Sequence, residues 1–291
     1  NGRSRRFDWS DSHLTVVNGD SIQSYAIDSW ELERELHVPR ARLVATGCGM
    51  TALGLRGQVQ VFEDHSGEPS RTLNPGASSL TDLRFSPRCD YLAASATQLT
   101  VWKTGDWRAL PPLAKGGGTI RSIAWSPDGE YLALGQHDGV RLFSTSVWEE
   151  EQSFKADKVV TSVGWSADNT KIAAAAKSLL IWDVVASKLA HHVRHSRLHD
   201  CDDACEPMSA VFVSFSPTSE LVVTHNEDFT SPIRLWERDS DGDGVADSED
   251  SMPSISDVFL VVLAIWVGLL ALFGWLVHRY VRARREELQG S

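Results

Sequence analysis

The feature that constrains this chain most is a block of residues that recurs along it. Its clearest copy spans residues 118–154 and reads as three strands and the start of a fourth. Apolar and polar residues alternate over 121–125, which predicts a strand with one buried face. The sequences Ser-Pro-Asp-Gly at 126–129 and His-Asp-Gly at 137–139 supply turns, because proline presets φ and glycine tolerates positive φ.

Two independent markers give the period of the repeat. The distances from Phe85 to Trp125 and from Trp125 to Trp165 are both 40 residues. The residues that align at the end of the first strand are Trp9, Thr46, Phe85, Trp125, Trp165 and Phe215. The aromatics that align in the third strand are Tyr25, Phe62, Trp102, Phe143, Trp182 and Trp236. The sequence therefore predicts six copies of a four-stranded unit.

At this point the chain resembles the WD-repeat β-propeller family, over roughly residues 5 to 237. The resemblance is carried by the turns at 126–129, 86–88 and 216–218 and by Leu-Leu-Ile-Trp-Asp at 179–183. It implies an all-β fold, a β-propeller of about six four-stranded blades within residues 1–238. The chain departs from the family pattern: only Trp182-Asp183 is a Trp-Asp pair, and the Gly-His dipeptide is missing.

Two further expectations concern the ring of blades. Small side chains at 92–95 and 171–176 are expected where the sheets crowd the central channel. In the resembled family the start of the chain supplies the last strand of the final blade, whereas here only residues 1–5 precede the first block. We therefore expect the natural protein to begin further upstream, with a seventh blade and a targeting segment as an open alternative, and residues 1–291 to form an open or imperfectly closed ring.

Composition and motifs exclude several classes of function. The net charge is −11, whereas a nucleic-acid surface needs a basic face, so no nucleic-acid partner is expected. Neither a Gly-x-Ser-x-Gly elbow nor a His-Glu-x-x-His pair is present, and we do not expect an enzyme.

An acidic spacer at 239–257 has the spacing of a calcium loop. Its pattern, Asp-x-Asp-x-Asp-Gly-x-x-Asp-x-x-Asp, resembles the loop of thrombospondin type 3 repeats and overlaps the EF-hand spacing. The expected calcium ligands are Asp239, Asp241, Asp243, the carbonyl of Val245, Asp247 and Asp250. The alternative is a solvated acidic linker. Calcium is the one cofactor that the sequence predicts.

A run of 20 uncharged residues at 258–277 is long enough to cross a bilayer as a helix. Asp257 precedes it, and Arg279, Arg282, Arg284 and Arg285 follow it. Since basic flanks mark the cytoplasmic side, we expect a single-pass membrane protein. The tail at 278–291 would be cytoplasmic and the propeller extracytoplasmic, with the lipid bilayer as a partner of the span.

The four cysteines and a histidine-rich insertion at 190–209 leave alternatives open. Cys201 and Cys205 are close enough for a local disulfide, or could join His191, His192, His195 or His199 in a zinc site, or remain free. Cys48 and Cys89 lie in or beside strands and are expected to be buried free thiols.

These observations predict a membrane-anchored, extracytoplasmic β-propeller that acts as a protein-interaction scaffold for a partner that the sequence does not identify. The loops at the ends of a rigid propeller are where recognition residues tend to lie. The alternative is an enzyme or ligand sensor with its site at the mouth of the central channel or in the insertion at 190–209.

Overall fold

The chain divides into two compact units, Asn1–Trp236 and Glu237–Ser291. The structure, a computed structural model, describes parts of the first unit: residues 7–10, 12–64, 66–111, 113, 118–156, 158–176, 178–193, 210–215, 222–226 and 234–236. The predicted calcium loop, membrane span and tail lie outside these residues.

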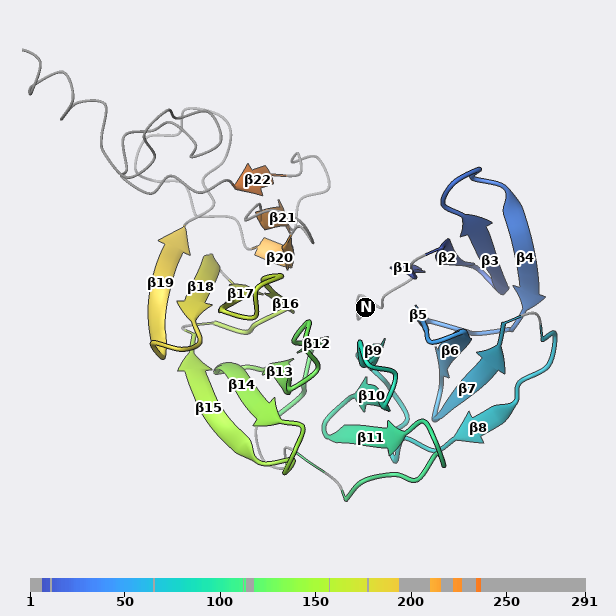
Figure 1. The fold of residues 1–291 in the computed structure, drawn as a ribbon, viewed down its shortest axis with the longest axis horizontal. Helices are drawn as coiled ribbons and strands as arrows, with labels where there is room; N and C mark the ends of the chain where they lie inside the picture. The colour runs from blue at the N-terminus through green and yellow to red at the C-terminus, as the bar shows by residue number, and fades with distance from the viewer. Residues whose placement is uncertain are drawn as a thin grey trace, which may run out of the picture. The chain divides into compact units, whose positions relative to one another are not determined.

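Six antiparallel sheets follow one another along the first unit, and in each the strands pair in chain order (Figure 1). Sheet 1 contains β1 (Phe7–Trp9), β2 (His13–Asn18), β3 (Ser21–Ala26) and β4 (Leu32–His37). Sheet 2 contains β5 (Leu43–Gly47), β6 (Met50–Leu55), β7 (Gln58–Glu63) and β8 (Arg71–Leu73). Sheet 3 contains β9 (Asp82–Phe85), β10 (Tyr91–Ser95) and β11 (Leu99–Lys103).

The second half of the unit repeats this arrangement. Sheet 4 contains β12 (Ser122–Trp125), β13 (Tyr131–Gly135), β14 (Gly139–Ser144) and β15 (Glu150–Lys155). Sheet 5 contains β16 (Ser162–Trp165), β17 (Lys171–Ala175), β18 (Leu179–Asp183) and β19 (Lys188–Val193). Sheet 6 contains β20 (Ala210–Phe215), β21 (Val222–Asn226) and β22 (Arg234–Trp236). The repeat markers therefore fall on first and third strands, as the sequence predicted.

Sheet 3 departs from the four-stranded prediction. Where a fourth strand is expected, residues 109 and 113 make only isolated bridges, Trp102 with Ala109 and Leu99 with Leu113. Pro111 lies between them, and proline has no N–H to donate to a ladder. The outermost edge of this sheet is therefore reduced to two points of pairing.

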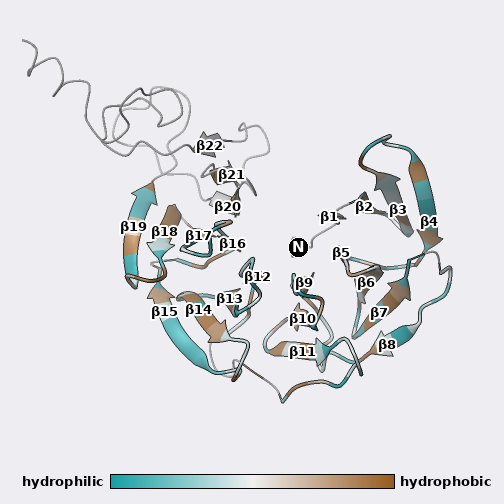
Figure 2. Cartoon of the chain, viewed as in Figure 1, coloured by the Kyte–Doolittle hydropathy of each residue, from teal (hydrophilic) through white to brown (hydrophobic). Residues whose placement is uncertain are grey.

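The hydrophobic core is divided into five clusters that lie between successive sheets. Between sheets 1 and 2, for example, Val17 and Ile22 pack against Val44, Leu53 and Phe62. The second and third strands are the most buried, whereas the outermost strands β4 and β15 bury only one residue each. Figure 2 shows the same contrast, with β14 and β18 coloured as hydrophobic and β15 as hydrophilic.

The small residues that the sequence singled out are buried between neighbouring sheets. Ala93, Ala173, Ala174 and Ala175 belong to second strands and are at most 1% exposed. Ala174 packs toward sheet 4, whereas Ala173 and Ala175 pack toward sheet 6. Small side chains on both faces of a second strand allow the neighbouring sheets to approach closely.

Hydrogen bonds between first strands hold neighbouring sheets in register. Asp82 is 5% exposed, and its Oδ2 accepts a hydrogen bond from the Ile123 backbone N–H at 3.1 Å. One repeat later, the Ser122 hydroxyl accepts from the Val163 N–H at 3.3 Å. The first strands contact one another in the order β1, β5, β9, β12, β16, β20, and among the described strands no pairing joins sheet 1 to sheet 6.

Candidate functional site

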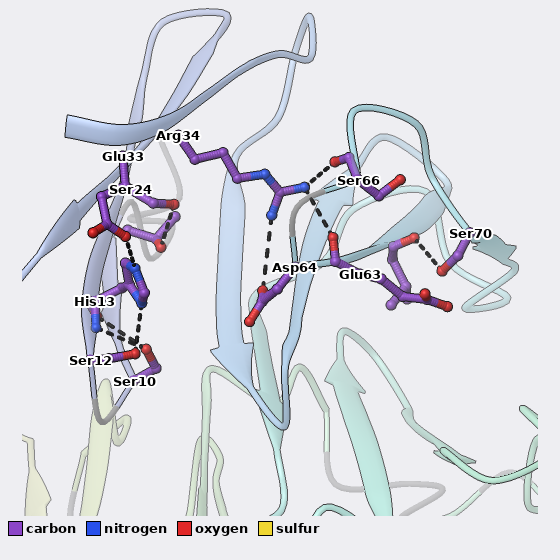
Figure 3. Close-up of polar contacts among 12 residues, drawn as sticks. Ser10, Ser12, His13, Ser24, Glu33, Arg34, Glu63, Asp64, Ser66 and Ser70 are labelled. Atoms are coloured by element: carbon purple, nitrogen blue, oxygen red, sulfur yellow. Dashed lines mark hydrogen bonds and ion pairs between the residues drawn. The ribbon is translucent and has the colours of Figure 1, made fainter.

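A cleft of about 880 Å³ lies between sheets 1 and 2, at the end of the sheets where each first strand turns into the second. Sheet 1 contributes residues from β2, β3 and β4, sheet 2 contributes the β5–β6 turn and the loop after β7, and sheet 3 contributes its β9–β10 turn. Most of the lining side chains are polar. Figure 3 shows the two polar groups that form its walls.

His13 holds one wall together. Its Nδ1 lies 2.7 Å from the Ser12 hydroxyl, and its Nε2 lies 2.6 Å from Glu33 Oε2 (Figure 3). The backbone N–H of His13 also donates to the Ser10 hydroxyl at 3.1 Å. A nucleophilic serine would be expected at Nε2 with the carboxylate at Nδ1, whereas here the order is reversed. The group therefore fixes the orientation of the imidazole and places Glu33 at the rim.

Arg34 crosses from sheet 1 to the loop that follows β7 in sheet 2. Its Nη2 donates to the backbone carbonyls of Glu63, at 3.2 Å, and of Ser66 (Figure 3). Its Nη1 lies 4.0 Å from Asp64 Oδ1, and its side chain is 16% exposed. Burial lowers the pKa of Arg34, and the nearby Asp64 charge acts in the opposite direction. The guanidinium thus links the two walls of the cleft.

The rim of the cleft is acidic. Hydrogen bonds from Ser21 and Gln23 lower the pKa of Glu35, so this carboxylate stays charged. The side chains of Glu33 and Asp64 are 52% and 50% exposed. Because three carboxylates share the rim with one largely buried guanidinium, the rim presents more negative than positive charge to solvent.

At two other junctions between sheets, aromatic side chains stack on one another at this end. Between sheets 3 and 4, Tyr91 stacks on Trp125 with centroids 6.1 Å apart, and Trp148 meets both rings edge-on. Between sheets 4 and 5, Tyr131 stacks on Trp165 at 6.2 Å. These residues come from three repeat positions: the start of a second strand, the end of a first strand and the loop after a third strand.

At the junction of sheets 1 and 2, all three positions have lost their aromatic residue. The start of the second strand is His13 and the end of the first strand is near Thr46. The loop after the third strand carries Ser66 and Gly67 instead of a tryptophan. All four residues line the cleft. The cleft thus lies where the repeat departs from its own pattern; the sequence showed the Thr46 substitution but not the other two.

A disulfide between Cys48 and Cys89 lines the cleft, with the Cα atoms 5.6 Å apart. The prediction that these residues are free thiols is therefore wrong. Each cysteine sits in the turn between a first and a second strand, with φ of 63° and 64°, and the two turns belong to adjacent sheets. Their sequence separation of 41 corresponds to one repeat, which was the signal that sequence reasoning missed.

Most of the other predicted site residues lie outside the described part of the chain. This holds for the calcium ligands Asp239, Asp241, Asp243, Val245, Asp247 and Asp250, and for Cys201, Cys205, His195 and His199. His191 and His192 lie on β19, where His192 Nε2 is 2.9 Å from the Ser178 hydroxyl. Within the described residues, no group of three or more His, Cys, Asp or Glu side chains is placed to hold a metal ion. In the same residues, no helix has the length and apolar character needed to cross a membrane.

Comparisons with known proteins agree with the repeat. Residues 83–168 match the family of the anaphase-promoting complex subunit 4 WD40 domain. The chain is 24% identical over 211 residues to the 77 kDa echinoderm microtubule-associated protein of Lytechinus variegatus, covering 64% of this chain and 29% of the length of that relative. A chain in the crystal structure of the mitotic checkpoint complex is similar with a TM-score of 0.67 and 18% identity, over 79% of this chain and 73% of that chain.

Proposed function

We propose that this chain, whose fold is that of a WD-repeat β-propeller, is a protein-interaction module that uses the cleft between sheets 1 and 2. The observation that carries the proposal is the cleft itself. Two other junctions hold stacked aromatic rings, whereas this one lacks them, and its cleft is polar, acidic at the rim and, at about 880 Å³, larger than the cleft of about 470 Å³ beside Tyr91 and Tyr131. Rigid sheets on both sides hold the cleft in shape, which lowers the entropic cost of binding.

We further propose that the module is carried on the outer side of a membrane. Residues 258–277 would be the single membrane-spanning helix, 278–291 the cytoplasmic tail and 239–257 a calcium-binding spacer. The basic flank after residue 277 supports this orientation. The Cys48–Cys89 disulfide supports it independently, since disulfides persist in oxidising compartments and are rare in reducing ones.

An enzyme or ligand sensor remains the alternative prediction, with its site at the channel mouth or in the insertion at 190–209. The order of Ser12, His13 and Glu33 does not favour it at the cleft, because the hydroxyl and the carboxylate meet the imidazole nitrogens in the reverse of a hydrolytic arrangement.

Partner capture tests the binding role. The full chain in lipid nanodiscs would be immobilised and exposed to the extracellular proteins of its source organism, with calcium and with chelator. Thr46→Trp rebuilds the missing plug and should lose at least one captured protein. Ser78→Trp places the same side chain at a smaller cleft, of about 240 Å³, between sheets 2 and 3 and serves as the matched control. Identical captured proteins for all three chains would refute the use of the cleft.

Protease treatment of intact cells tests the orientation. External protease should remove the propeller and leave the arginine-rich tail attached to the membrane. Protection of the propeller would refute its extracytoplasmic placement.

A further inference from the structure

We propose that the cleft receives a partner segment in which an aromatic side chain is flanked by a basic residue. The inference rests on the proposed binding function and names the chemistry of its partner. It follows from two independent properties of the cleft: the side chains that are missing from its interior and the charges that are present at its rim.

The interior lacks the aromatic ring that other junctions hold. At two other junctions the same place in the repeat holds an indole, that of Trp125 and that of Trp165, stacked on a tyrosine. The cleft is also lined by Phe85, Pro87 and the Cys48–Cys89 disulfide. An aromatic side chain from a partner would bury up to roughly 150–250 Å² of its surface.

The junction also offers a hydrogen-bond acceptor for an indole. Trp165 Nε1 donates to the carbonyl of Ala124, a residue of the preceding first strand, at 3.1 Å. In sheet 1 the corresponding position is Asp8, whose Oδ2 accepts from the Thr46 N–H at 2.8 Å and the Thr46 hydroxyl at 3.4 Å. Asp8 is thus engaged with Thr46, and the acceptors that the cleft itself offers an indole N–H are the serine and threonine hydroxyls and the carboxylates that line it.

The rim selects for a basic neighbour. Glu33 and Asp64 lie on opposite walls, each about half exposed, and Glu35 adds a third carboxylate. A Lys or Arg beside the inserted ring would meet these charges, whereas an acidic residue would be repelled. Because the carboxylates are exposed, this contribution should weaken as salt is added.

Three fluorescein-labelled peptides test the inference: Gly-Lys-Trp-Lys-Gly, Gly-Lys-Ala-Lys-Gly and Gly-Glu-Trp-Glu-Gly. Binding to the full chain in nanodiscs would be followed by fluorescence anisotropy at roughly 0.15 M salt. We expect the Lys-Trp-Lys peptide to bind about tenfold more tightly than either other peptide. Equal affinity for the three peptides would overturn the inference.

Variants locate the binding. Thr46→Trp should weaken the Lys-Trp-Lys peptide about tenfold, and Ser78→Trp should leave its affinity unchanged. Thr46→Phe, which copies Phe85, provides the same test with a smaller ring if the tryptophan variant does not fold. The double variant Glu33→Gln with Asp64→Asn should bring the Glu-Trp-Glu peptide to the affinity of the Lys-Trp-Lys peptide. Full binding by both filled variants would place the peptide elsewhere and refute the inference.

The two levels of the proposal fail separately. If protein capture depends on an open cleft but the three peptides bind alike, the binding function stands and the aromatic-and-basic chemistry is wrong. If neither protein capture nor peptide binding responds to filling the cleft, both are wrong.

Discussion

Removing the disulfide between sheets 2 and 3 should cost a large and calculable part of the stability. Cys48 and Cys89 are 41 residues apart, and closing a loop of that length lowers the entropy of the unfolded chain by about 13 cal/mol/K. This corresponds to about 4 kcal/mol at 25 °C. It is an upper figure, because engineered disulfides often stabilise a protein less than the loop-entropy model predicts. The variant Cys48→Ala with Cys89→Ala should therefore lower the free energy of unfolding by about 2–4 kcal/mol.

Urea denaturation with and without dithiothreitol measures this effect. With a slope of about 3 kcal/mol per molar urea, the midpoint should fall by roughly 1 M in the double variant, and by the same amount in the reduced native chain. Dithiothreitol should not lower the midpoint of the double variant further. A companion variant, Cys201→Ser with Cys205→Ser, shows whether the second predicted disulfide contributes. If dithiothreitol leaves the urea midpoint of the native chain unchanged, the stabilising role of the Cys48–Cys89 bond is refuted.

Three further predictions concern single sites. Trp148→Ala should lower the free energy of unfolding by about 2–3 kcal/mol, because it removes the ring that contacts Tyr91 and Trp125. This is less than the loss for a fully buried tryptophan. The exposed control Val147→Ala should change the unfolding midpoint little. Burial raises the pKa of Asp168, but bonds from Ser166 and Thr170 and the charge of Lys171 lower it more, so the net pKa is depressed. This stabilisation is present above about pH 4 and lost as pH falls through the folded-state pKa, and Asp168→Asn should flatten the acid limb of a thermal-melt series. Asp241→Ala with Asp243→Ala should abolish calcium binding in a calorimetric titration; an unchanged titration would leave only a solvated linker.

The first-strand and third-strand positions could be predicted because they are local patterns. Trp125 and Phe143, for example, occupy fixed places relative to a turn, and the repeat carries both to the next sheet. The loss of the fourth strand from sheet 3 could not be predicted from the period alone, because Pro111 removes a hydrogen-bond donor without changing the spacing of the repeat. Local chemistry there outweighed the repeat.

The candidate site was harder to predict because its parts come from different copies of the repeat. Thr46 was visible as a departure from the aromatic pattern. The roles of His13 and Gly67 could not be recognised, because the sequence does not show which strand start and which loop lie next to Thr46 across the junction. The Cys48–Cys89 pair has the same origin. Equivalent turns of neighbouring sheets lie side by side, so a separation of one repeat places two cysteines within bonding distance.

The bonds between first strands and their turns have a consequence for how the molecule comes apart. Asp8 reaches Thr46, Ser122 reaches Val163 and the Asp128 N–H reaches Asn169, over separations of 38, 41 and 41 residues. The insertion lengthens one such step, from Ser162 to Val213, to 51 residues without removing the bond. Each described sheet is thus held mainly by the next one along the chain. Such an array behaves as a one-dimensional series of nearest-neighbour contacts, in which damage to one sheet acts mainly on the sheets beside it.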